Sequence, residues 1–194
     1  MNNQQQPRRN FIKKSFLSTV AVGAGISFLT PSTQLFATSE DAGKSALDAK
    51  NEKEFRMGVI GPAELSLAIS KIATDKALQK NAKEFAGFEL TEAISVTSVL
   101  KDLGTPVPQM DAKAKAILEK MKNTSSGNEF DTIYIKAQLE THEFLRDLAQ
   151  NYLRNSKGKT TAAESHGKHL AMLALANFKE HIAMTQRILG ELNA

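Results

Sequence analysis

The sequence contains no cysteine, no tryptophan and only two tyrosines among its 194 residues. Without cysteine the chain can form no disulfide bond, no thiolate metal site and no cysteine nucleophile. The scarcity of large aromatic side chains argues against a pocket that stacks sugars or nucleobases. Three short motifs are also missing: the phosphate-binding loop GxxxxGK[ST], the serine-nucleophile elbow GxSxG and the zinc-protease motif HExxH. The sequence therefore contains none of these local motifs by which an enzyme class could be identified.

Acidic residues are absent from the first 39 positions, which hold four basic residues, Arg8, Arg9, Lys13 and Lys14. This segment accounts for the net charge of +4, because 21 of the 25 basic residues remain after it against 21 acidic ones. No basic patch with interleaved aromatic residues follows it, as nucleic-acid binding would require. We therefore expect no nucleic-acid partner.

The stretch RRNFIKKS precedes an uncharged apolar run of 14 residues, from Phe16 to Leu29. A helix that spans a bilayer needs about 20 apolar residues, so this run is short for a permanent anchor. Together with the small residues near position 39, the pattern predicts a cleavable signal peptide over residues 1–39. Its basic end resembles the twin-arginine translocation motif. The residues that match this motif are Arg8, Arg9, Phe11, Ile12 and Lys13.

This segment predicts an exported bacterial protein, located in the periplasm or associated with the envelope, whose mature part has no permanent membrane span. Two alternatives stay open: an ordinary secretory signal, and an N-terminal anchor that is retained. The twin-arginine route carries proteins that are already folded, often with a metal or cofactor loaded. The predicted twin-arginine signal therefore slightly favours a bound metal in the mature protein.

Residues 40–53 are polar and rich in small side chains, which predicts a linker. From residue 54 onward, apolar residues recur at helical spacing in four long segments, at about 54–78, 81–103, 129–154 and 161–192. A shorter helix at 111–121, capped by Asp111, is expected between the second and third. Gly61 and Pro62 predict a kink, or a short separate helix, within the first segment.

Four amphipathic helices with mostly short connections favour an antiparallel four-helix bundle over residues 54–194, with the short extra helix between helices 2 and 3. In this all-α fold each apolar stripe is buried against the others. The stripes that we expect to face the core include Met57, Leu103, Leu170 and Leu173. No segment of useful length alternates as a strand does.

Several polar side chains lie inside or beside these apolar stripes. Glu89 and His181 lie near the centres of the second and fourth stripes, Glu64 at the edge of the first, and His142 beside the third. Carboxylates and imidazoles from facing helices are ligands of iron, manganese and zinc in helical bundles. The alternative is a structural network in which Glu89 and His181 pair with each other or with Asn177 and Tyr134. A further pair, His166 and His169, lies on a polar first turn, where solvent exposure is expected.

From Phe55 to the C-terminus the chain resembles the bacterial family labelled domain of unknown function 4142, exported proteins with a ferritin-like helical bundle. The matching pieces are AELSLAISKIATDKALQKNAKEFA, LKDLGTPVP, FDTIYIKAQLETHEFLRDLA and NFKEHIAMTQRIL. The resemblance points to an acidic residue in the first helix, a Phe, Asp, Tyr and His pattern in the third, and a histidine in the fourth. In this sequence these are Glu64, then Phe130, Asp131, Tyr134 and His142, and last His181.

The chain departs from the family pattern at two places. The Asp-His pair that is common in the family's second helix is replaced here by Glu92 and Ala93, and Ala176 replaces the proline before the last histidine. A di-iron site of the ferritin kind also needs Glu-x-x-His on two helices. Here Leu139 and Phe178 occupy the glutamate positions. The resemblance thus implies a fold and an exported location, without a reaction.

We interpret the sequence as an exported, non-catalytic, ferritin-like bundle that serves as a binding or envelope-associated module, with an unidentified protein or small molecule as its partner. The alternative is a bundle that binds a divalent metal ion, either as such or as the centre of a redox or hydrolytic enzyme. Its expected ligands are Glu64, Glu89, His142 and His181, with Glu92 in reserve. The side chains expected to orient these ligands are Gln138, Asn177 and Tyr134.

Overall fold

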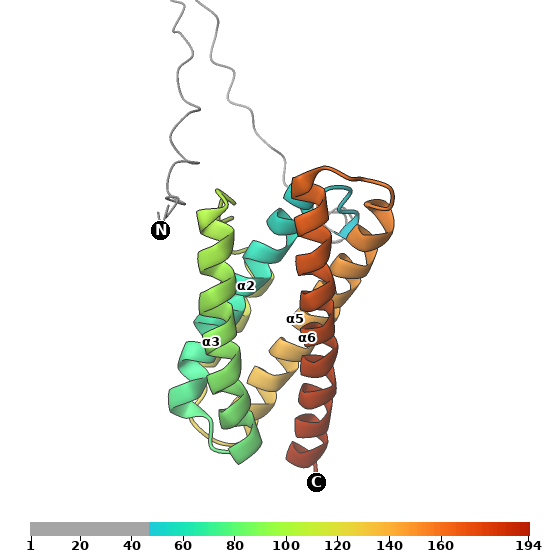
Figure 1. The fold of residues 1–194 in the computed structure, drawn as a ribbon. Coiled ribbons are helices and arrows are strands. Elements are labelled where there is room, and N and C mark those ends of the chain that lie inside the picture. The colour runs from blue at the N-terminus through green and yellow to red at the C-terminus, as the bar shows by residue number, and fades with distance from the viewer. Residues whose placement is uncertain (1–46) are drawn as a thin grey trace, which may run out of the picture. The chain divides into compact units, whose positions relative to one another are not determined.

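The computed structural model describes residues 47–194, which form five α-helices and no strand (Figure 1). The helices are α2 (Glu52–Lys76), α3 (Lys80–Asp102), α4 (Ala112–Asn123), α5 (Asn128–Asn155) and α6 (Ala162–Leu192). This confirms the all-α class for the described part of the chain. Within residues 47–194, no helix combines the length and the apolar character that crossing a bilayer requires. The five residues of the predicted twin-arginine motif lie outside the described residues.

Side chains and glycines define the ends of the helices. Asn51 accepts a hydrogen bond from the backbone N–H of Glu54 (2.9 Å), and Asp111 accepts one from Ala114 (2.7 Å), so each caps the helix that follows it. The predicted cap at Asp111 is therefore confirmed. Helix α3 is followed by a left-handed glycine, Gly104 (φ 71°). This conformation lets the backbone N–H groups of Gly104 and Thr105 donate to the last carbonyls of the helix.

The turn between α2 and α3 is held from a distance by Asp131 of α5. Its carboxylate, 1 % exposed, accepts hydrogen bonds from the backbone N–H groups of Leu78 (3.3 Å) and Gln79 (2.8 Å). These N–H groups precede α3 and have no helical partner of their own. Asp131 thus fixes the exit of α2 and the entry of α3 against the start of α5.

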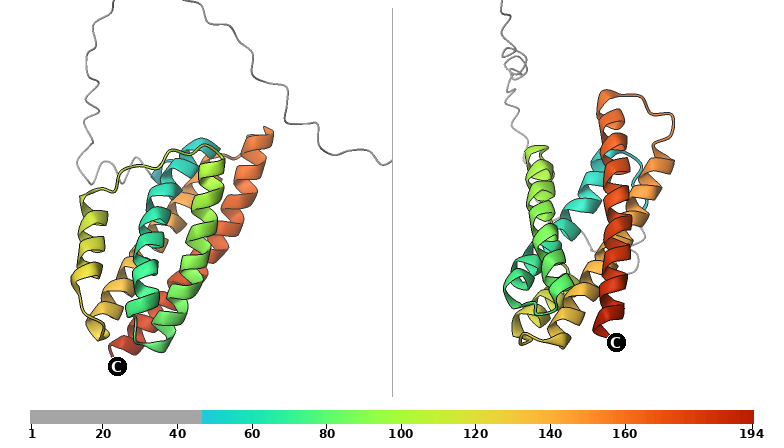
Figure 2. Two further views of the ribbon diagram at one scale, coloured as in Figure 1. Left: turned by 90° about the vertical axis from the view of Figure 1, so that its left-hand side faces the viewer. Right: turned by 60° about the horizontal axis from the view of Figure 1, so that its bottom comes forward.

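The long helices pack side by side as a helical bundle, with α2 against α3 and α5, and α5 against α6. The short α4 lies at the margin, where it contacts α2 and α5 (Figure 2). Helices α3 and α6 are not among the pairs with extensive contacts, although their side chains meet at several points. The bundle is therefore less tightly closed along the side between α3 and α6.

The core consists of two apolar clusters at different heights. One cluster includes Ile69, Phe85, Tyr134 and Ile188, and the other includes Ile60, Leu100, Leu148 and Ala171. Along α2, α3, α5 and α6, buried polar residues stand between the two clusters. These residues are Ser66, Ser70, Glu89, Gln138, His142 and His181. We call this set the polar layer.

Two expectations drawn from the sequence need correction. Helix α2 runs without interruption through Gly61 and Pro62, so the separate short helix is wrong, while the alternative of a kink stays a prediction. Met57, Leu103, Leu170 and Leu173, which were expected to face the core, are about half exposed or more, Leu173 to 69 %. They lie toward the start of α2, the end of α3 and the start of α6, which is the end of the bundle that holds the apolar cluster of Ile60 and Leu148.

Candidate metal centre

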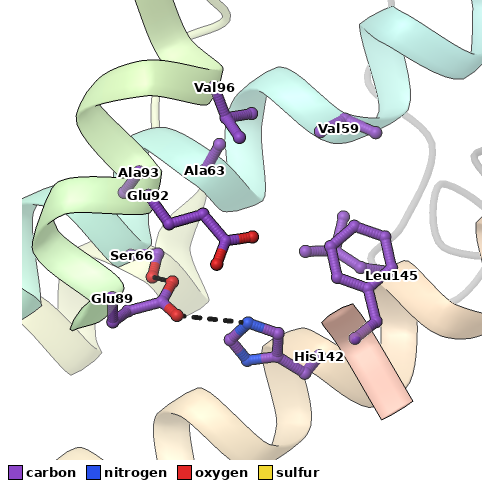
Figure 3. Close-up of a pocket in the computed structure, with 10 residues that line it drawn as sticks. Val59, Ala63, Ser66, Glu89, Glu92, Ala93, Val96, His142 and Leu145 are labelled. Atoms are coloured by element: carbon purple, nitrogen blue, oxygen red, sulfur yellow. Dashed lines mark hydrogen bonds and ion pairs between the residues drawn. The ribbon is translucent and has the colours of Figure 1, made fainter. Parts of the chain in front are cut away.

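Three residues of the polar layer, each from a different helix, direct one ligand atom toward a common point. Glu89 Oε2 of α3 lies 3.0 Å from His181 Nδ1 of α6 and 3.4 Å from His142 Nε2 of α5. The two ring nitrogens lie 3.0 Å apart. Figure 3 shows Glu89 and His142 facing each other across the gap between their helices. We call Glu89, His142 and His181 the three-residue cluster.

The cluster is shielded from solvent. The side chains of Glu89, His142 and His181 are 5 %, 3 % and 11 % exposed. The ring of Phe85 packs edge-on against both imidazoles, with centroid distances of 6.4 Å to His142 and 5.3 Å to His181. Because a buried charge is costly without a partner, these groups must satisfy one another or hold an ion.

The orientation of His142 is fixed by its own helix. Its Nδ1 lies 2.8 Å from the backbone carbonyl oxygen of Gln138, one turn earlier. A carbonyl oxygen only accepts hydrogen bonds, so Nδ1 carries the proton in the neutral ring and Nε2 presents a lone pair. A carbonyl behind the ring is the usual partner of a metal-binding histidine.

His181 is flanked by a second carboxylate on its far side. Glu92 Oε2 lies 3.5 Å from His181 Nε2, and Asn177 Nδ2 donates a hydrogen bond to Glu92 Oε1 (3.4 Å). This carboxylate favours a proton on Nε2, which leaves the lone pair of Nδ1 facing Glu89. In that arrangement three lone pairs converge with no proton between them. The metal-free protein must therefore keep an extra proton in the cluster.

A chain of buried hydroxyl and amide groups leads from Glu89 into the core. Ser66 donates a hydrogen bond to Glu89 Oε1 and also lies 3.0 Å from the side-chain amide of Gln138. That amide is 2.9 Å from Ser70 Oγ, which is 2.9 Å from the hydroxyl of Tyr134. Ser66, Ser70, Gln138 and Tyr134 are each at most 2 % exposed.

The direction of these hydrogen bonds is set by the number of protons. Ser66 has one hydroxyl proton, which the charged Glu89 takes. In the structure Gln138 Nε2 donates to Ser70 and Oε1 faces Ser66, so the single Ser66 proton has two acceptors. A half-turn of the amide, which exchanges its oxygen and nitrogen, removes this conflict. In that orientation every group of the chain donates toward the Glu89 carboxylate.

The pKa values of the cluster reflect these contacts. Burial on its own would raise the pKa of Glu89, but hydrogen bonds with His142 and His181, the charge of His142 and the Ser66 hydroxyl outweigh it and hold that pKa well below 4.5. Burial would lower the pKa of His181, whereas its hydrogen bond to Glu89 and the charges of Glu89 and Glu92 raise it above 6.5. The metal-free cluster is thus an anionic carboxylate with a proton held on the imidazoles.

The ligand atoms are spaced as they would be around a single metal ion. Separations of 3.0 to 3.4 Å between ligand atoms are those expected for bonds of about 2.1 Å at angles of about 90 to 110°. One carboxylate oxygen and two imidazole nitrogens suit iron(II), manganese(II) or zinc(II). The cluster can therefore accept such an ion without a rearrangement of the helices.

Of the four ligands expected from the sequence, the structure brings Glu89, His142 and His181 together. Glu64 is not part of this group, because its Oε1 lies 2.6 Å from Lys101 Nζ. Glu92, the reserve ligand, stands beside His181. Gln138 contacts the cluster as expected, whereas Asn177 reaches it only through Glu92, and Tyr134 only through Ser70 and Gln138. His166 and His169 are exposed, as expected.

Sequence reasoning missed Ser66 and Ser70. Both are fully buried and connect Glu89 to Tyr134. Their spacing of four residues on the inner face of α2 was the available signal, since it places two hydroxyls on one side of a helix. A serine in an apolar stripe is common, however, and does not stand out as a buried glutamate does.

Comparison with known proteins gives one match. A family model described as "Domain of unknown function (DUF4142)" matches residues 37–188. Searches of curated proteins and of solved structures found no match. The matched region includes every residue of the polar layer.

Proposed function

The chain belongs to the DUF4142 family, whose description gives no activity, and we propose that its three-residue cluster binds one divalent transition-metal ion inside the bundle. The observation that carries the proposal is the convergence of Glu89 Oε2, His142 Nε2 and His181 Nδ1 within 3.4 Å of one another. Within the described residues, this is the group of acidic and histidine side chains whose ligand atoms lie close enough to share an ion.

The surroundings of the cluster support this proposal. The Gln138 carbonyl holds His142 with its Nε2 toward the cluster, and Ser66 holds Glu89 through its second oxygen, Oε1. Such outer partners fix the direction of the ligands, and an acceptor behind a histidine also raises the basicity of its ligand nitrogen. Glu89 Oε2 faces the two imidazole nitrogens, at 3.0 and 3.4 Å, and has no other hydrogen-bond donor within residues 47–194. A cation at the point that these atoms share would replace the extra proton as the partner of this oxygen.

A structural network is the competing function for the same atoms. In that case a proton on His181 Nδ1 bonds to Glu89 Oε2 at 3.0 Å, and the cluster serves only to hold α3 and α6 together. Both functions require a buried anionic Glu89, so burial and electrostatics alone favour neither. The competing functions differ in metal uptake.

Elemental analysis separates them. The mature protein is purified without chelator or histidine tag and loaded in turn with iron(II), manganese(II) and zinc(II) before mass spectrometry. We expect close to one ion per chain, and loss of that ion in His142→Gln. The matched control is His169→Gln, an exposed histidine of α6, which keeps the metal. Retention of metal by a folded His142→Gln variant, or a wild type that takes up none of the three ions, would falsify the proposal.

We extend the proposal to the architecture. An antiparallel four-helix bundle of the ferritin-like kind accounts for the pairs of helix ends that meet. Asn81 at the start of α3 donates to Glu191 at the end of α6 (2.7 Å), and Arg56 near the start of α2 donates to the Leu103 carbonyl at the end of α3 (3.1 Å). Cysteines introduced at Asn81 and Glu191 should cross-link, whereas parallel α3 and α6 would keep them apart.

The proposed metal is mononuclear. A ferritin-type pair of irons would need a glutamate three residues before each histidine, but Leu139 and Phe178 stand there. The location forms part of the proposal as well: the residues around Arg8 and Arg9 favour export of the folded chain to the periplasm or envelope. Export after folding would allow the ion to be loaded inside the cell.

A further inference from the structure

A small cavity adjoins the three-residue cluster. Its volume is about 30 Å³, and its polar lining consists of Ser66, Glu89, Glu92 and His142. The rest of its wall is apolar and comes from α2, α3, α5 and α6, including Val59, Ala63 and Leu145. Figure 3 shows the Glu92 carboxylate pointing into the space between the Glu89 and His142 pair and these apolar side chains.

The size and lining of this cavity limit what can enter it. By the same measure, about 10 to 15 Å³ is enough for one water molecule, which needs two to four polar partners when buried. The cavity therefore has room for about two non-hydrogen atoms, and Glu92 supplies a hydrogen-bond acceptor. A molecule of metabolite size does not fit inside this volume, and the cavity is partly open to solvent, which lets its content exchange.

The cluster leaves room for one more ligand on an ion. Three protein ligands on a metal typically leave an open position for water or substrate, whereas sites that serve only structure are closed by four. Phe85 covers the cluster on one side, through its contacts with both imidazoles. Glu89 and His142 both line the cavity. Among the described residues, the cavity is therefore the place where a non-protein ligand could reach the ion.

On the basis of the metal site proposed above, we propose that the cavity holds one exchangeable, water-sized ligand of the ion. Water or hydroxide occupies it at rest, and Glu92 is a positioning residue that accepts a hydrogen bond from this ligand. Asn177 holds Glu92 in place through its hydrogen bond to Oε1 (3.4 Å). The site thus discriminates by size: it admits ligands of one or two non-hydrogen atoms and excludes larger ones.

Water relaxation on the manganese(II)-loaded full chain tests this inference. Manganese(II) with a bound, exchanging water strongly enhances the longitudinal relaxation of solvent protons. We expect this enhancement in the wild type, its loss when fluoride replaces the water, and no change with imidazole at the same concentration. Elemental analysis of the same samples counts the bound manganese.

Variants give the matched comparison. Ala63→Leu fills the cavity from α2 and should abolish the enhancement while the bound manganese stays the same. Ala176→Leu, at an exposed position of α6, is the control and should match the wild type. Glu92→Gln preserves the shape but removes the negative charge, so it should retain manganese and lose the enhancement at a lower fluoride concentration than the wild type. If Ala63→Leu fails to fold, Val96→Ile narrows the same cavity and should reduce the enhancement.

The outcomes separate the two proposals. Absence of bound manganese in the wild type would overturn both the metal site and the exchangeable ligand. Stoichiometric manganese without any enhancement, or with an enhancement that survives Ala63→Leu and responds equally to imidazole, would overturn only the exchangeable ligand. Absence of enhancement would leave a closed metal site whose function is structural, whereas an enhancement that survives would place the exchanging water outside the cavity.

Discussion

At the scale of single residues, the chemistry depends on one acid in an unusual place. Glu89 stays ionised at 5 % side-chain exposure because Ser66, His142 and His181 all face it. Burial raises its pKa, but these contacts lower the pKa by more, so the net shift is downward. The result is a fixed negative charge that attracts either a proton onto the imidazoles or a metal ion.

These shifts predict how the stability of the metal-free protein depends on pH. The lowered pKa of Glu89 gives a stabilisation that is present above the unfolded value of 4.5 and is lost as the pH falls toward the folded value. The raised pKa of His181 gives a stabilisation that is fully present below 6.5 and is lost as the pH rises through the folded value. We therefore expect maximal stability between about pH 5 and pH 6.5.

Urea unfolding at a series of pH values in the presence of chelator checks this prediction. The wild type should lose stability on both sides of the maximum, whereas His181→Gln should be less stable and lose the decline on the alkaline side. His166→Gln, an exposed histidine, is the control and should follow the wild type. A wild type whose stability keeps rising from pH 6 to pH 8 would contradict the assigned proton.

At the scale of helices, the apolar periodicity predicted the main elements well. The four long segments and the short helix after GTPVP are present as α2 to α6, each within a few residues of its expected bounds. Such agreement follows from local physics, because capping residues such as Asp111 and left-handed glycines such as Gly104 act on their own segment. The same local signals carry no information about which neighbour covers a given face.

The exposed apolar residues show where local reasoning stops. Leu103 and Leu170 share the helical period of buried neighbours, but each is about half exposed, so no neighbouring helix covers it fully. The site shows the same division. The sequence indicates Glu89 and His181 as site residues because an ionisable group inside an apolar stripe is unusual. Glu64 carries a similar signal, but in the structure it pairs with Lys101. Only the packing of the helices shows which of these residues lie together.

The contact from α5 to the turn between α2 and α3 gives a prediction at this scale. Asp131→Ala removes the acceptor for the N–H groups of Leu78 and Gln79 and should lower the free energy of unfolding by about 2 kcal/mol, since hydrogen bonds to charged groups contribute about 1.5 to 3 kcal/mol. The control is Glu129→Ala, which removes an exposed acid from the same first turn of α5.

Chemical denaturation monitored by circular dichroism measures both variants. The control separates capping of the turn from the general effect of an acid at a helix N-terminus, since both variants lose that effect. If the two variants lose the same stability, Asp131 does not hold the turn. A selective loss in Asp131→Ala supports it.

At the scale of the whole molecule, the export proposal rests on residues before the described domain. Replacing Arg8 and Arg9 together by lysine preserves the charge of the segment but removes the arginine pair. We expect the precursor to accumulate inside the cell, because the twin-arginine route requires that pair whereas an ordinary secretory signal requires only positive charge.

Cell fractionation of the host, with precursor and mature forms resolved by size, provides the measurement. Lys14→Arg is the control, since it changes a basic residue of the same segment outside the motif and leaves the pair intact. Normal export of the double-lysine variant would indicate an ordinary secretory signal, and a full-length chain in the membrane fraction would indicate a retained anchor.

The polar layer between the two apolar clusters also determines vertical register. A long helix that slid by one turn, about 5.4 Å, would still meet apolar side chains above and below, and leucine and isoleucine replace each other in such contacts at small cost. It would, however, separate Glu89 from Ser66 and from both imidazoles. A bundle with such a shift would contain a buried charge without a partner, which is strongly destabilising. The side chains that gather around one point therefore also disfavour shifted arrangements of the helices.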